Sequence, residues 1–176
     1  MELSRADIKK YLYTLNDKLK NIGEHGELIL FGGAVMSLVH DFRKSTEDID
    51  AIYSPKEIIN KISEEIAEEF SLNKNWLNDS VKGFIFSKIE KEILLNMSNL
   101  RVYAVAPDYM LAMKLTALRR DTKDIEDIKF LLEYLDIKYK EDLYNLLHKY
   151  IPERMINIKT KFFIEEIFSK ERGDFI

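Results

Sequence analysis

The spacing of apolar residues along the chain predicts a first helix that begins at a capping Ser4 and ends at Gly23. Apolar residues recur there at steps of three and four, which places them on one helical face. The residues on that face are Ile8, Leu12, Leu15, Leu19 and Ile22. A second amphipathic helix is predicted to begin within residues 54–57, where Ser54 is expected to cap the helix and Pro55 to be its first residue.

Short apolar or alternating runs predict strands elsewhere in the first 106 residues. Strands are expected over residues 28–31, 48–53, 84–86, 93–96 and 101–105. A short helix is expected over 34–39, and residues 71–80 are expected to form a loop around Trp76. Within that loop, Trp76 is expected to be a packing anchor more than a surface for base stacking.

From Pro107 onward the pattern is helical. Helices are predicted over residues 107–119, 122–135, 140–149 and 152–169. The predicted fold class is therefore α/β or α+β, with a small mixed sheet flanked by helices in residues 1–106. Residues 107–176 are expected to form a helical C-terminal subdomain that packs on this core as part of a single compact unit.

The amino-acid composition excludes several kinds of site and function. The 176 residues include no cysteine, which excludes disulfides, thiolate metal sites and cysteine nucleophiles. The net charge of −4 argues against non-specific coating of nucleic acid. An apolar run of the ~20 residues that a membrane span needs is absent from the sequence, and the first residues lack a signal-peptide core, so a cytoplasmic protein without a membrane partner is expected.

The most informative acidic residues are Asp48 and Asp50, which flank Ile49 on a predicted strand. Residues at i and i+2 of a strand point to the same face, roughly 6.5 Å apart along the chain. Two carboxylates this close repel each other unless a cation neutralises them. Mg²⁺ or Mn²⁺ would do so, and pairs of such ions act in phosphoryl transfer. The alternative is a solvated strand end.

Gly32 and Gly33 lie between a predicted strand and a predicted helix. Glycines at such a junction let backbone N–H groups approach a phosphate closely, although a simple tight turn is the alternative. Together with the two aspartates they predict a nucleoside triphosphate site. The sequence contains neither a GxxxxGK[ST] loop nor a GxGxxG fingerprint, so P-loop and Rossmann sites are excluded.

Residues 30–53, LFGGAVMSLVHDFRKSTEDIDAIY, resemble the signature of the polymerase-β-like nucleotidyltransferase superfamily. The Arg43, Ser45 and Thr46 positions before the aspartates are similar to those of minimal prokaryotic nucleotidyltransferase-like proteins, which include the AbiE-type abortive-infection toxins. Residues 109–128 resemble the family's helical Lys-x-x-Ala…Arg…Asp-x-x-Asp motif, and residues 76–84 a Trp-Leu-Asn-Asp element of an uncharacterised bacterial branch.

The resemblance implies roles for residues in all three motifs. Asp48 and Asp50 would bind the metal, and Lys114 would bind phosphate, with one of Asp121, Asp124 and Asp127 completing the site. The residues implied in nucleotide binding are Gly32, Gly33, Arg43, Ser45, Thr46, Asn78, Asp79 and Lys82. The chain departs from the family at Gly33, where many members have Ser, and at residues 100–105, a strand on which the superfamily usually carries a third carboxylate.

Each of these residues also has a simpler interpretation. Lys114 could be a lysine snorkelling from an apolar helix. Asp124 and Asp127 could be acids that complement a helix dipole, and Asp121 could cap that helix. Arg43 and its neighbour Lys44 could be solvated loop charges.

The expected function is metal-dependent transfer of a nucleoside monophosphate to a hydroxyl of RNA, protein or a small molecule. The alternative is a non-catalytic nucleotide- or partner-binding component of a toxin–antitoxin or phage-defence pair, with an antitoxin as the possible partner. An RNA-binding adaptor is disfavoured by the net charge, although Lys114, Arg119 and Arg120 form a local basic cluster.

Overall fold

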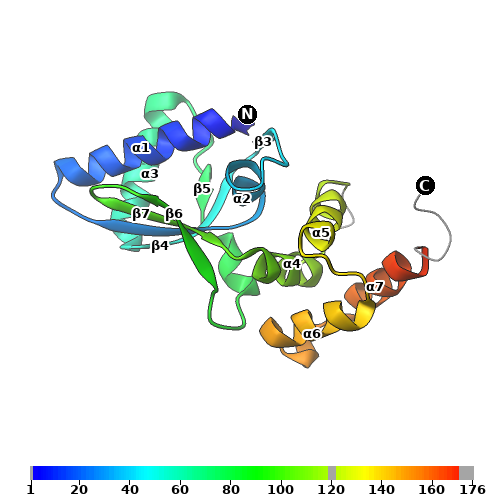
Figure 1. Cartoon of the computed structure of the whole chain (residues 1–176). Helices are drawn as coiled ribbons and strands as arrows, with labels where there is room; N and C mark the ends of the chain where they lie inside the picture. Colours follow the sequence, from blue (N-terminus) through cyan, green and yellow to red (C-terminus); the bar gives the residue numbers. More distant parts are fainter. Residues whose placement is uncertain (1, 119–121, 171–176) are drawn as a thin grey trace. The chain divides into compact units, whose positions relative to one another are not determined.

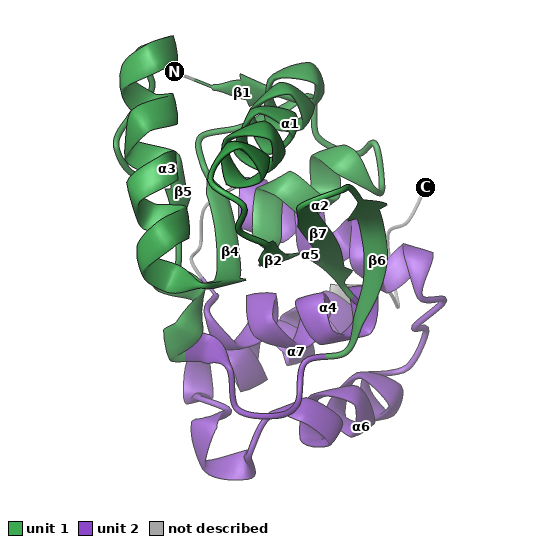
Figure 2. Cartoon of the chain, turned by 90° about the vertical axis from the view of Figure 1, so that its left-hand side faces the viewer, with its two compact units in different colours: residues 1–83, 90–105 green, residues 84–89, 106–176 purple. Residues whose placement is uncertain are grey.

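The structure, a computed structural model, describes residues 2–118 and 122–170 of the chain. Its helices and strands are labelled in Figure 1. They divide into two compact units (Figure 2): residues 1–83 with 90–105, and residues 84–89 with 106–176. The predicted α+β class is confirmed, because a small mixed sheet flanked by helices is combined with further helices in the C-terminal part.

The first unit is built on a five-stranded sheet with the order β5-β4-β2-β7-β6. Its strands are β2 (Gly26–Leu30), β4 (Ile49–Ser54), β5 (Leu77–Asn78), β6 (Lys91–Asn96) and β7 (Leu100–Val105). The central strand β2 runs antiparallel to β4 and parallel to β7, while β4 and β5 are parallel and β6 and β7 antiparallel. A separate two-stranded sheet pairs β1 (Leu3–Ser4) with β3 (Ser45–Thr46).

Helices α1 (Arg5–Asn21) and α3 (Lys56–Phe70) pack on each other and on this sheet (Figure 1). The predicted start of α1 is confirmed: Ser4 accepts from the Asp7 N–H, and the Asp7 carboxylate accepts from the Ser4 N–H. The predicted apolar face of α1 is buried, except that Ile22 lies beyond the last helical residue and is 57% exposed.

Helix α2 (Gly32–Leu38) follows β2 directly. The Phe31 N–H donates to the Asp50 carbonyl oxygen at 2.9 Å, which extends the pairing of β2 with β4 up to the first turn of α2. The glycine pair thus begins a helix beside the N-terminal end of β4. This local geometry brings residues 32–33 and 48–50 together in the first unit.

Three local predictions are wrong. Ser54 does not cap α3, because it is the last residue of β4 and pairs with Glu27, and Pro55 takes the N-cap position. The expected loop over residues 71–80 contains β5, which pairs with β4. Residues 80–84 form a 3-10 turn where a strand was expected to begin.

The second unit contains helices α4 (Pro107–Thr116), α5 (Thr122–Tyr134), α6 (Lys140–Tyr150) and α7 (Ile158–Lys170). The helix expected over 152–169 is divided into a 3-10 turn at Glu153–Met155 and α7. The buried Thr160 hydroxyl donates to the Leu115 carbonyl oxygen at 2.7 Å and ties α7 to α4. In the part of the chain that the structure describes, every helix is too short or too polar to cross a membrane.

Candidate functional site

The aspartates predicted to bind metal lie at the N-terminal end of β4. Asp48 precedes the strand and Asp50 is its second residue, and both are partly buried. Ile49 between them is fully buried, as expected for a residue that points to the opposite face of the strand.

A second segment, at β5 and the turn after it, contacts both carboxylates. The Asn78 side-chain amide donates to Asp48 Oδ2 at 3.0 Å. The Ser80 hydroxyl lies 3.1 Å from Asp50 Oδ1 and 2.6 Å from Asn78 Oδ1. The two aspartates are therefore linked through one short stretch of chain that is separated from them by 30 residues in sequence.

The backbone of Gly32 lies close to this group of side chains. Its φ of +57° is in the left-handed region, which glycine adopts without the penalty a side chain brings. A Cβ added at this position would lie 3.3 Å from Asp50 Oδ2. The backbone at the start of α2 therefore passes directly beside one of the two carboxylates.

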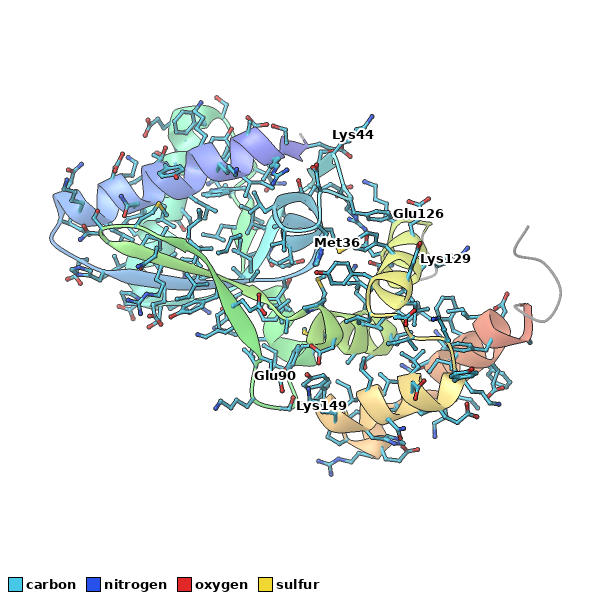
Figure 3. The ribbon with its side chains drawn as sticks, viewed as in Figure 1. Met36, Lys44, Glu90, Glu126, Lys129 and Lys149 are labelled. Carbon is cyan, nitrogen blue, oxygen red and sulfur yellow. The ribbon has the colours of Figure 1, made fainter. Side chains whose placement is uncertain are left out.

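Gly33 is packed against two residues that the sequence implies in nucleotide binding. A Cβ added to Gly33 would lie 2.3 Å from Thr46 Oγ1 and 3.2 Å from Arg43 Nη1. The structure thus brings Arg43, Thr46 and Gly33 together. Ser45 instead donates its hydroxyl to Glu2, and Lys44 is exposed and projects outward from its loop (Figure 3).

This packing explains the departure at Gly33 and yields a prediction. Gly33→Ala should lower the free energy of unfolding by about 1–3 kcal/mol, because the new methyl group overlaps the buried Thr46 hydroxyl. In a Thr46→Ala background the same substitution should cost less, since the overlapping oxygen is gone. Urea denaturation of the wild type, the two single variants and the double variant measures this difference in cost.

Gly83→Ala is the matched control, because a Cβ there meets no described atom within 4 Å. It should leave the urea midpoint nearly unchanged. Equal losses from Gly33→Ala with and without the Thr46 hydroxyl would show that the overlap does not decide the choice of glycine.

Asp79 and Lys82, both expected to contact nucleotide, are paired with each other. The Asp79 carboxylate accepts from Lys56 and from Lys82, each at 2.6 Å. These hydrogen bonds, from Lys56 first and Lys82 second, lower the pKa of Asp79 to about 2. The cluster therefore carries one negative and two positive charges at neutral pH, and both lysines remain about half exposed.

The donor set around Asp48 and Asp50 suits a hard divalent cation. Mg²⁺ commonly takes one or two protein carboxylates and completes its coordination with water and substrate phosphates. Within residues 2–118 and 122–170, no group of three or more His, Cys, Asp or Glu side chains gathers that could hold a metal ion. Two carboxylates beside a glycine backbone fit a cation that shares its remaining positions with water and phosphate.

A second cluster of predicted site residues lies within the helical unit. Lys114 on α4 is 2.8 Å from Asp124 Oδ1 and 2.7 Å from Asp127 Oδ2, both on α5. The side chains of Lys114 and Asp127 are 11% and 0% exposed, whereas Glu126 and Lys129 are exposed and project outward from α5 (Figure 3). The expected shared face of Asp124 and Asp127 is thus the face toward α4. Asp121, with Arg119 and Arg120, lies outside the described residues.

A family model described as nucleotidyltransferase of unknown function (DUF6036) matches residues 10–166. The chain belongs to this family. No curated protein and no solved structure matches the chain. The DUF6036 match includes the aspartates of β4, the Asn78 segment and the Lys114 cluster, and supports a nucleotidyltransferase-like role.

Sequence reasoning missed two residues around these candidate site side chains. Ser80 contacts Asp50, and Lys56 contacts Asp79. Ser80 follows the Trp-Leu-Asn-Asp element directly, so its place two residues after Asn78 was a usable signal. Lys56 begins α3, and its sequence position carries no sign of an ion pair with a residue 23 positions later.

Proposed function

We propose that this chain is a metal-dependent nucleotidyltransferase that moves a nucleoside monophosphate from a nucleoside triphosphate to a hydroxyl group and releases pyrophosphate. The observation that carries the proposal is the grouping of Asp48, Asp50 and the Gly32 backbone at one end of β4. The match to a nucleotidyltransferase family supports the same assignment.

In this proposal Asp48 and Asp50 hold Mg²⁺ or Mn²⁺. When bound, such an ion neutralises charge that develops on the phosphate oxygens. The chain's own contribution is positioning. Arg43 lies beside Gly33 and supplies a cation for the triphosphate, while the glycine backbone lets the phosphates come close. Thr46, whose hydroxyl is packed against Gly33, holds this backbone in place.

The family motif implies further roles for residues of the helical unit. Lys114 is the candidate phosphate cation, and Asp124 or Asp127 is the candidate third carboxylate. Support for these roles comes from the family motif and from the grouping of all three side chains. The pairing also gives Lys114 a structural role in the helical unit.

The acceptor and biological role belong to the same proposal. The Arg43-x-Ser45-Thr46 segment before the aspartates resembles the AbiE-type branch, and we therefore propose an RNA or protein hydroxyl as acceptor and an antitoxin as partner. A small-molecule hydroxyl is the alternative acceptor.

Position-specific labelling of the triphosphate tests the reaction. Label at the α-phosphate should pass to an acceptor in mixtures that contain Mg²⁺ and RNA, protein or small-molecule fractions, and EDTA should stop the transfer. Label at the γ-phosphate should stay in the released pyrophosphate. Transfer of the γ-label instead would identify phosphoryl transfer and contradict the proposal.

One observation favours a second candidate, a non-catalytic nucleotide-binding component of a toxin–antitoxin or phage-defence pair. The strand β7, which pairs with the central strand β2, has the sequence LRVYAV and carries no carboxylate. Superfamily members usually carry the third carboxylate on such a strand. Calorimetric binding of triphosphate with Mg²⁺, combined with no transfer of α-label to any acceptor, would support this candidate over the enzyme.

A further inference from the structure

The Asn78 side chain is engaged inside the protein at both ends of its amide group. Its Nδ2 donates to Asp48 Oδ2 at 3.0 Å. Its Oδ1 accepts from the Ser80 backbone N–H at 3.0 Å and lies 2.6 Å from the Ser80 hydroxyl. Nδ2 also lies 3.5 Å from the Asn75 carbonyl oxygen, so the amide oxygen and nitrogen both have partners within the chain, which leaves little capacity for recognising a nucleotide.

Ser80 holds this amide in place and reaches the second carboxylate. Its hydroxyl has a single proton, which can be donated either to Asn78 Oδ1 or to Asp50 Oδ1 at 3.1 Å. The Ser80 backbone N–H binds Asn78 Oδ1 in either case. The orientation of Asn78 is thus fixed independently of where the hydroxyl proton lies.

The segment that carries Asn78 is itself firmly anchored. Trp76 is 1% exposed, and its indole N–H donates to the Ser63 carbonyl oxygen on α3 at 2.9 Å. The Ile49 N–H donates to the Trp76 carbonyl oxygen at 2.6 Å, and Asp50 pairs with Asn78 in the β4–β5 register. The pairing of β5 with β4 and the buried Trp76 ring therefore fix the position of Asn78 beside the two aspartates.

We propose that Asn78 is a positioning residue, which orients the Asp48 carboxylate for the metal and does not bind the nucleotide itself. This inference rests on the proposed function and revises the nucleotide-binding role that the sequence implies for Asn78. Hydrogen bonds to metal-ligating carboxylates fix their orientation, and their removal typically costs about 10–100-fold in metal affinity. Without the Asn78 amide, Asp48 loses the hydrogen bond that orients its Oδ2 atom.

Metal and nucleotide titrations of the full chain test this role separately. Asn78→Ala should raise the Kd for Mn²⁺, measured without nucleotide by EPR of the free ion, by about 10–100-fold. Its Kd for a fluorescent triphosphate in EDTA should stay unchanged. Ser80→Ala should raise the Mn²⁺ Kd less, because the backbone N–H still holds Asn78. Asn73→Ala, at an exposed amide of the same loop, is the matched control.

An Asp48→Asn background shows whether Asn78 acts through Asp48. There, Asn78→Ala should cause no further loss of Mn²⁺ affinity. Wild-type Mn²⁺ affinity in folded Asn78→Ala, or weaker triphosphate binding in EDTA, would overturn the positioning role alone. If Asp48→Asn itself leaves Mn²⁺ binding at the wild-type level, the proposed metal site fails.

Discussion

Replacing Asp48 or Asp50 with asparagine is expected to lower the rate of α-label transfer by at least about 10³-fold, roughly 4 kcal/mol of transition-state stabilisation. Asparagine has the same shape but no charge, so it weakens the hold on a divalent cation. It keeps an oxygen that can accept from Asn78 at position 48 or from Ser80 at position 50. Transfer should therefore fall while the fold is retained, as measured by the labelling assay and by thermal unfolding.

Asp41→Asn is the control for this loss. It removes the same charge from the same unit, at a carboxylate that is 77% exposed and paired only with Arg5 among the ion pairs described. Its transfer rate should match that of the wild type. Unchanged transfer in both Asp48→Asn and Asp50→Asn would remove these aspartates from the mechanism and, with them, the proposed metal site.

The residues that sequence reasoning placed correctly in the fold are those whose signal is local. The Ser4–Asp7 capping box and the apolar face of α1 lie within one helix, so spacing alone predicts them. Asp48 and Asp50 likewise flank a buried residue of one strand. These features depend on neighbours a few positions away, which a periodic pattern records directly.

The features that sequence reasoning missed depend on distant partners. β5 consists of two residues. It forms because it pairs with β4 and because the preceding Trp76 packs against α3. The predicted cap at Ser54 is wrong for the same reason, since pairing with Glu27 keeps Ser54 in β4. Contacts such as Ser80–Asp50, between residues 30 positions apart, leave no periodic trace in the sequence.

Lys114→Met is expected to lower the free energy of unfolding by about 3–5 kcal/mol, because it leaves the fully buried Asp127 carboxylate without the lysine that lies 2.7 Å away. Lys114→Met/Asp127→Leu should recover most of this loss, since apolar residues often replace a buried ion pair without net cost. Lys138→Met is the matched control. Its pair with Asp136 is mostly exposed, so its loss should cost at most about 1 kcal/mol in urea denaturation.

The double variant also separates the two roles of Lys114, because its stability is restored while the cation stays absent. If Lys114 binds phosphate, as proposed, this stable variant should still bind the fluorescent triphosphate at least about tenfold more weakly than the wild type, a difference of roughly 1.4 kcal/mol. Wild-type triphosphate affinity in the double variant would assign Lys114 to the stability of the helical unit alone. A single Lys114→Met as stable as the wild type would contradict the structural role.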